Sequence, residues 1–381
     1  MTLNGYNLDI AINGAYVKEF DAREFTFSLR DSIHSLYPRG TFKVNDVSGY
    51  LLESRAFTEG IPVEITMGFN EISLTNKYLF HKMEVPVVPN PNQLSGEIDA
   101  SLIHESYRTE SMDSKSFPYN PSAIVNSLFN YNFMGKVIEQ TKILSTNHLY
   151  QPRTTKEDFV KNVLLPNSLS AKQSPSPYYC FIDSKDILHY ESLLGMLSKN
   201  PITKLYLTSK NRVEYYQKIL SFQPFSYDIT KHRNSLDFSF EIITDDDNKE
   251  FERKEISVSD VQSPYPLYNC TKENVPVFDE IEENFDESVY SSIINKQRYS
   301  LLSDRVLVTT PLHTDYCAGT VLELDTEYAG SNSSFSYHGL YLIEQSDHVW
   351  NGETQDGFTQ MILARVSPTF SPDFELEGGM K

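Results

Sequence analysis

Nine histidines are scattered along this chain of 381 residues, and two of them, His338 and His348, fall in one predicted strand. Two imidazoles on one element are candidates for a metal site, because neutral imidazole is a common metal ligand. The spacing of the pair puts both rings on one face of the strand but about 33 Å apart, at about 3.3 Å per residue. They cannot share an ion, and we interpret both as structural.

Two acidic stretches are the next candidates for chemistry. The run Asp245–Asp247 suggests calcium binding, but an EF-hand loop needs alternating ligands and a glycine at its sixth position. Here the acids are contiguous and the sixth position is Glu250. The run Asp279–Glu287 offers the paired carboxylates that glycoside hydrolases use, but nothing nearby indicates a sugar-binding cleft. Both runs are typical of solvated loops.

Sequence motifs of the common enzyme classes are absent from the chain. There is no G-x-S-x-G, H-E-x-x-H, Walker A or Rossmann fingerprint. The three cysteines, Cys180, Cys270 and Cys317, are far apart and odd in number, which indicates neither a zinc site nor a disulfide framework. We therefore expect no enzymatic activity, no catalytic residues, no cofactor and no metal.

The charge of the chain restricts its partners. Its 52 acidic and 33 basic residues give a net charge of −19, whereas a protein that binds duplex DNA presents a basic stripe. We expect no sequence-specific binding of nucleic acid. The acidic excess fits either simple solubility or a surface that must not retain nucleic acid. We also expect no secretion signal, because the N-terminus lacks a basic segment before an apolar core, and no membrane insertion, because no apolar run approaches 18 residues.

Alternating patterns predict the elements of the N-terminal third. Phe25, Phe27 and Leu29 fall on one face of a strand, and Phe42 and Val44 fall on one face of the next. The opposite faces carry polar residues, so each strand has one buried and one solvated side. Further strands are predicted at 61–69, 76–88 and 97–103. This number of strands with short turns predicts a small antiparallel barrel over residues 1–106.

Helical signals then appear, which predicts an α+β domain over residues 107–208. Asn120 and Pro121 are typical of a helix N-cap and first turn. Thr154 and Thr155 precede acidic residues at the spacing of a capping box, and Pro166 ends that second helix. The stretch "YYCFIDSKDILHYESL" predicts two strands joined by an Asp-Ser-Lys-Asp turn.

The remainder of the chain predicts a second barrel made from residues 209–243 together with 298–368. The stretch "SLDFSFEI" at 235–242 alternates like "EFTFSLR" at 24–30, as an internal duplication would. Three more strands are predicted at 319–325, 339–350 and 358–366. Residues 244–297 form an acidic insertion, a helix is predicted at 292–304, and 369–381 form a tail. The fold class is therefore mainly β with α+β insertions, made of two similar small antiparallel β-barrels plus an α+β middle domain.

Three stretches together resemble the baseplate hub proteins of contractile-tailed phages, a family whose fold also forms the base of type VI secretion spike proteins. Residues 27–54 are similar to the family's first hairpin, in which a strand ending in an arginine-aspartate pair leads to a second strand. Residues 154–193 are similar to its capped helix followed by an aromatic strand, an Asp-led turn and a returning strand. Residues 318–366 resemble its closing strands, with His348 before the last hairpin.

This resemblance implies a structural baseplate hub located in the virion tail and assembled in the host cytoplasm. Family members form homotrimers whose two barrels per subunit give a ring with pseudo-sixfold symmetry, which adapts the sixfold tail tube to the threefold spike and lets DNA pass. Partners would be a separate central spike protein, the tail tube protein and other baseplate proteins. Two alternatives are open: a receptor-binding or adsorption protein at the tail tip, and a tail-associated peptidoglycan hydrolase. The type of tail, the residues of any interface and the role of 244–297 are not determined by the sequence.

Overall fold

The computed structural model describes 14 segments of the chain: 2–3, 6–16, 25–46, 58–69, 72–84, 96–118, 120–141, 149–168, 176–207, 213–224, 240–244, 251–255, 305–326 and 337–365. Several predictions lie outside them. These are the acidic runs Asp245–Asp247 and Asp279–Glu287, Cys270, the helix at 292–304, and the tail at 369–381.

The N-terminal region, residues 2–104, is an antiparallel sheet of eight strands. They are β1 (Thr2–Leu3), β2 (Tyr6–Ile12), β3 (Ala15–Tyr16), β4 (Phe25–Ser32), β5 (Arg39–Asp46), β6 (Pro62–Phe69), β7 (Ile72–Glu84) and β8 (Gly96–His104). The main ladder has the order β1-β2-β6-β7-β8-β5-β4, and β3 pairs with β2. The predicted strands are confirmed; the one expected at 76–88 begins earlier, at Ile72, and its predicted last residues, 85–88, lie outside the described residues.

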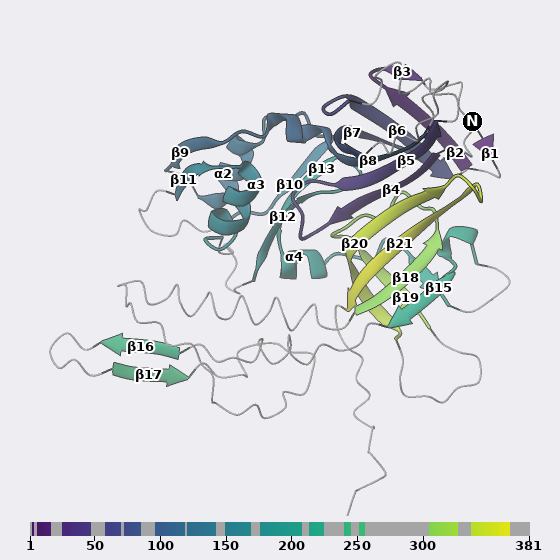
Figure 1. The fold of residues 1–381 in the computed structure, drawn as a ribbon. Helices are drawn as coiled ribbons and strands as arrows, with labels where there is room; N and C mark the ends of the chain where they lie inside the picture. The colour runs from purple at the N-terminus through teal and green to yellow at the C-terminus, as the bar shows by residue number, and fades with distance from the viewer. Residues whose placement is uncertain are drawn as a thin grey trace, which may run out of the picture.

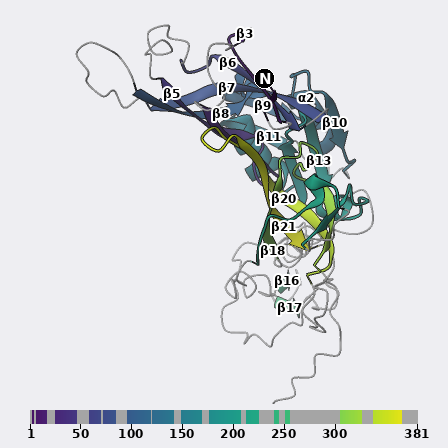
Figure 2. The ribbon, with the colours of Figure 1, turned by 90° about the vertical axis from the view of Figure 1, so that its right-hand side faces the viewer.

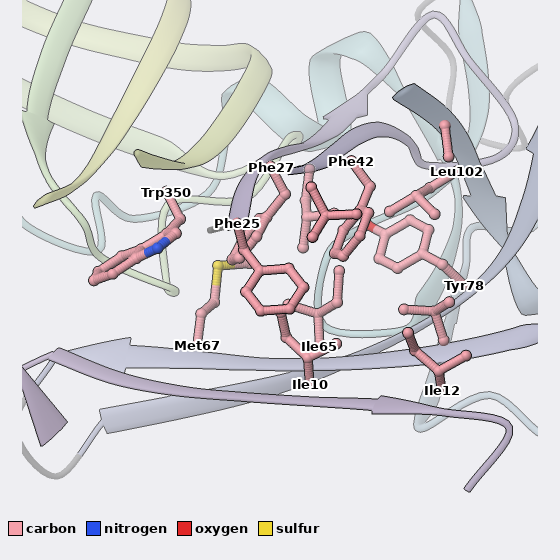
Figure 3. Packing of buried hydrophobic residues seen from close by; sticks show 14 of the residues in the cluster. Ile10, Ile12, Phe25, Phe27, Phe42, Ile65, Met67, Tyr78, Leu102 and Trp350 are labelled. Atoms are coloured by element: carbon pink, nitrogen blue, oxygen red, sulfur yellow. The ribbon is translucent and has the colours of Figure 1, made fainter. Parts of the chain in front are cut away.

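The sheet curls around one apolar core. Phe25, Phe27, Leu29, Phe42 and Val44 are all buried, as the alternating pattern predicts, and they pack with residues of β2, β6, β7 and β8. Figure 3 shows the side chains of Ile10 and Ile65 pointing toward that of Phe25. The strands β2, next to the end strand β1, and β4, at the other end of this ladder, therefore line the same interior, as in a barrel that is left open between them.

The middle region, residues 105–200, combines helices with two small sheets. Its elements are η2 (Glu105–Thr109), β9 (Asp113–Phe117), α2 (Pro121–Leu128), β10 (Gly135–Ile138), β11 (Leu149–Thr154), α3 (Lys156–Phe159), η3 (Val160–Leu164), β12 (Tyr178–Ile182), β13 (Ile187–Ser192) and α4 (Leu193–Leu197). The predicted caps are confirmed: the side chain of Asn120 accepts from Ala123 N, and that of Thr155 accepts from Asp158 N. The helix after Thr155 is shorter than a regular α-helix, because a π-helical turn replaces its second half.

The C-terminal region, residues 201–365, contains β14 (Lys204–Tyr206), η4 (Tyr215–Gln217), β15 (Ser221–Pro224), β18 (Arg305–Pro311), β19 (Val321–Asp325), β20 (Gly339–Asn351) and β21 (Asp356–Arg365). The strands β19, β20 and β21 confirm the prediction, whereas β18 was not predicted. These strands surround a second apolar core that includes Leu205, Val306 and Met361. Ile219 N donates to the carbonyl of Tyr206 on β14 and Leu220 N donates to Thr309 on β18, so the segment before β15 links the two sides of the sheet.

One sheet runs through both regions, because β20 pairs with β4 from Gln345↔Ser32 to Trp350↔Phe27. Figure 1 shows β4 and β20 side by side between the two groups of strands. The mainly β, antiparallel fold class is confirmed. The ladders of the described strands close neither group into a complete barrel, and Trp350 of β20 fills the first core instead.

The two remaining described strands, β16 (Phe240–Thr244) and β17 (Phe251–Glu255), pair with each other and with no other described strand. Residues 235–239 of the stretch "SLDFSFEI" lie outside the described residues. Its equivalence to "EFTFSLR" and the domain boundaries given above therefore stay predictions. A strand at 251–255 was not expected inside the acidic insertion.

Replacing Phe27 tests the buried face of β4. Phe27→Ala removes a ring that is 1% exposed, and we expect a loss of about 3–5 kcal/mol in the free energy of unfolding. Ser28→Ala is the control on the opposite face and should stay within about 0.5 kcal/mol of the wild type. Denaturant titrations of the three proteins measure both values. A larger loss for Ser28→Ala would show that the two faces of the strand are assigned the wrong way round.

Candidate functional site

The structure places His338 and His348, the two histidines considered as metal ligands, apart from each other and in different contacts. His348 of β20 is buried, with its ring nitrogens 3.3 Å from Ser184 Oγ and 3.2 Å from Thr359 Oγ1. Burial lowers the pKa of His348 to about 4, so the ring is neutral at physiological pH. The carbonyl of His338 accepts from Arg365. No group of three His, Cys, Asp or Glu side chains among the described residues is arranged to hold a metal ion.

A Ser-His-Asp arrangement exists that the sequence did not suggest. His104 Nδ1 lies 2.8 Å from Ser106 Oγ, and His104 Nε2 lies 3.2 Å from Asp186 Oδ1. Ser106 is fully buried, so its hydroxyl cannot reach a substrate. His104 instead caps the short helix η2, because its side chain accepts from Ser106 N. We assign the arrangement to the structure of the middle region and not to catalysis.

The connector between β4 and β5 contacts all three regions. It begins at Ser32 at the end of β4, and its apolar residues Ile33, Leu36 and Tyr37 are buried although they lie in a turn. Ile33 packs between the middle and C-terminal regions, and its N–H donates to Glu344 O. Leu36 and Tyr37 belong to the core of the middle region, and Leu36 O accepts from Ile182 N. This connector therefore positions the other two regions against the first sheet.

Asp31, the last inward-facing residue of β4, joins the three regions through one oxygen. Its Oδ2 accepts from Ser184 N in the middle region at 2.8 Å and from Ala318 N in the C-terminal region at 3.3 Å. Asp31 is 1% exposed, and Oδ1 has no hydrogen-bond partner in the described structure. Burial and the nearby charge of Asp183 raise the pKa of Asp31 to about 7. We name this contact the three-way junction: Asp31, Ser184 and Ala318.

A chain of buried ionic contacts supports the junction from the middle region. Asp183 Oδ2 lies 3.0 Å from His189 Nε2, and His189 Nδ1 lies 2.7 Å from Glu191 Oε1. Burial lowers the pKa of His189, but the hydrogen bonds to the two carboxylates outweigh it, and the net shift is upward. Lys199 Nζ donates to Glu191 Oε1 at 2.9 Å and to the carbonyl of Gly319 at 3.2 Å. These two bonds connect the series of ionic contacts to the C-terminal region.

Gly319 follows Ala318 and sits too close to the middle region for any side chain. Its φ is +79°, a left-handed conformation that favours glycine, and an added Cβ would lie 2.5 Å from Phe181 Cζ. The Phe181 ring stacks on His189 at 4.7 Å between ring centroids. The backbone of the C-terminal region thus packs directly on the aromatic strand β12.

The seam between β4 and β20 is also held by ion pairs. Arg30 reaches Asp347 with Nε at 2.6 Å and Nη2 at 3.1 Å, a two-bond contact to one carboxylate. Glu344 accepts from Arg305 Nη2 at 2.6 Å and lies 2.5 Å from His34 Nε2 of the connector. Glu344 lies where the register shifts between Ile343 and Gln345, so this bulge aims its side chain at both partners.

The face of the shared sheet opposite the two cores is a broad solvent-facing surface. We name it the outer face, and it consists of alternate residues of six neighbouring strands: Thr41, Lys43, Thr26, Ser28, Arg30, Gln345, Asp347, Val349, Phe358, Gln360, Ile362, Leu307, Thr309, Ser221 and Gln223. All but Asp347 are exposed or half-buried. Its cations Lys43 and Arg30 lie 3.0 Å and 2.6 Å from Asp99 and Asp347. In Figure 2 the strands β5, β20 and β18 follow one curved band.

Solved structures of tail proteins share this fold. The tail protein from Neisseria meningitidis MC58 matches with a TM-score of 0.57 at 10% identity, over 95% of this chain and 97% of that chain. The 43 kDa tail protein of prophage MuSo2 from Shewanella oneidensis matches with a TM-score of 0.60 at 11% identity, over 95% and 98% of the two chains. The resemblance noted in the sequence is thereby confirmed at the level of the fold.

A third similar structure comes from a secretion system. It is an E. coli protein described as a component of the type VI secretion system with structural similarity to T4 bacteriophage tail proteins. Its TM-score is 0.52 at 9% identity, over 93% of this chain and 76% of that chain.

No family model matches the chain, and no curated protein matches it. Within the described residues, no helix has the length and apolarity needed to cross a membrane.

Two glycine substitutions test the packing at the junction. Gly319→Ala should lower the free energy of unfolding by about 1–3 kcal/mol more than Gly14→Ala, because only the first introduces a clash. Gly14 is the matched control: its φ is also +79°, but nothing lies within 4 Å of an added Cβ, so it reports the cost of the backbone conformation alone. Denaturant titrations measure the difference. Equal losses would mean that the contact between Gly319 and Phe181 is not close-packed.

Proposed function

We propose that this protein is a structural hub of a phage or phage-like tail baseplate, which assembles as a homotrimeric ring. The observation that carries the proposal is the extent of the shared fold, which covers 95% of this chain and at least 97% of two tail proteins. A match of whole chain to whole chain favours the same kind of part over a shared domain with a different use. The proposal includes no enzymatic activity and a location in the virion tail.

The outer face is the surface that we assign to the channel of this ring. It continues without interruption across the β4–β20 pairing, so each copy presents two groups of strands, one N-terminal and one C-terminal. In this proposal three copies line a channel with six such groups. Its residues are mostly small polar or apolar, and Lys43 and Arg30 are paired with carboxylates. Such a surface offers few free cations to phosphate groups, which supports passage of DNA without retention. In this proposal the ends of the ring contact a separate spike protein and the tail tube.

Assembly is the first test of the proposal. A trimer of 43.7 kDa subunits has a mass of about 131 kDa (3 × 43.7), and such interfaces usually bury more than about 2,000 Å². Light scattering at micromolar concentration should give this mass, and electron-microscopy class averages should show a hollow ring. A monomer, both alone and with a candidate spike protein, would count against the hub. An elongated particle would favour the receptor-binding alternative.

A charge substitution tests the assignment of the outer face. Ile362→Asp introduces a carboxylate at a half-buried position in the middle of that face. If the face lines a channel, the trimer mass should be unchanged and the free energy of unfolding should fall by less than about 1 kcal/mol. Ile362→Ala is the control for lost packing. Dissociation of the aspartate variant alone would show that the face is buried between subunits.

A further inference from the structure

Asp31 and Asp183 are two buried carboxyl groups with unequal sets of donors. Asp183 Oδ1 accepts from Lys185 N and from Ile187 N, both at 2.9 Å, and Oδ2 lies against the ring of His189. Both backbone donors to Asp31 lie on Oδ2, and they and the Ser184 hydroxyl lower its pKa by less than burial and Asp183 raise it. Two neighbouring carboxylates in a buried site repel each other, and the one with fewer hydrogen-bond donors is the better place for a proton. The geometry therefore favours a proton on Asp31 Oδ1.

The surrounding groups do not supply a counter-charge to that oxygen. Cys317 and His348 contact Ser184 Oγ, not Asp31, and burial disfavours the charged form of both. Lys185 is paired with Asp315 at 2.5 Å. The titratable groups that line the junction come from five elements: Asp183 and Lys185 of the turn, His189 and Glu191 of β13, His313, Asp315 and Cys317 of the loop after β18, His348 of β20 and Tyr78 of β7.

We propose that Asp31 is a proton-dependent latch between the three regions: the neutral acid holds Ser184 of the middle region and Ala318 of the C-terminal region on β4, and loss of its proton loosens both contacts. The reason is solvation. An ionised Oδ1 would be a buried charge beside Asp183, and it is solvated only if the turn or the loop moves away. This inference does not rest on the proposed function, since it concerns how one subunit is held together.

The sign of the pH dependence follows from the direction of the shift. When the junction opens, Asp31 meets water and returns to the usual pKa of an aspartate, about 3.9. The closed form therefore binds more protons than the open form, and its advantage falls as pH rises from about 4 to about 7. Above that range both forms are ionised, and no further loss comes from this group.

Hydrogen exchange at the two donor amides measures the latch directly. After correction for intrinsic exchange, the protection of Ser184 N and Ala318 N in the wild type should fall by about tenfold per pH unit between pH 5 and 7 and then level off. The amides of Phe42 and Val308, in the two cores, should not follow this slope. Protection at Ser184 and Ala318 that is independent of pH in the wild type overturns the proposal, whatever any variant does.

Asp31→Asn removes the titratable proton and keeps the shape of the side chain. The amide keeps an acceptor for both N–H groups and cannot ionise, so the pH slope at Ser184 and Ala318 should disappear while the fold is kept. Asp99→Asn is the matched control, because Asp99 is a half-exposed partner of Lys43 far from the junction, and this variant should keep the wild-type slope. The same slope in Asp31→Asn as in the wild type would assign the pH dependence to another group and overturn the latch.

Discussion

The fold depends on a single strand, β4, that pairs with the N-terminal strands along one edge and with the C-terminal strands along the other. One face of β4 supplies Phe25, Phe27 and Leu29 to the first core, while its free edge pairs with β20 of the other end of the chain. At its end, Asp31 and the connector reach the middle region. All three regions meet at this strand and the turn after it, and their relative positions are set by the β4–β20 pairing, the contacts of Asp31 and the apolar cluster around Ile33.

This arrangement explains why polar groups are buried at the centre of the molecule. Backbone N–H groups of the 183–186 turn and of the loop after β18 approach the sheet where no strand can pair with them, so side chains must accept their hydrogen bonds. Asp31 serves Ser184 and Ala318, and Thr359 serves His313. Asp183 and His189 hold the turn that brings Ser184 there. The cluster looks catalytic in composition, but its role in the fold is to satisfy buried backbone.

The comparison with tail proteins shows how little sequence such a fold requires. At 9–11% identity, few residue types are shared, yet the chains superpose over more than nine tenths of this chain. A sheet needs only apolar residues at alternate positions and suitable turns, and many sequences meet that condition. The function that we propose uses surfaces and symmetry, so it needs no fixed set of reactive residues.

The sequence by itself determined the local structure. Alternation placed Phe27 and Phe42 inside, the threonine-acid spacing capped the helix at Thr155, and the Asp-led turn joined β12 to β13, because each depends on residues within a few positions of one another. The tertiary structure decided which strands are neighbours. Arg30 and Asp347 are 317 residues apart in the chain, and no pattern in the sequence paired Asp31 with the backbone N–H groups of Ser184 and Ala318. An alternating strand specifies which side is apolar, but its hydrogen-bonding edge is the same for every partner, so only the packed molecule selects one.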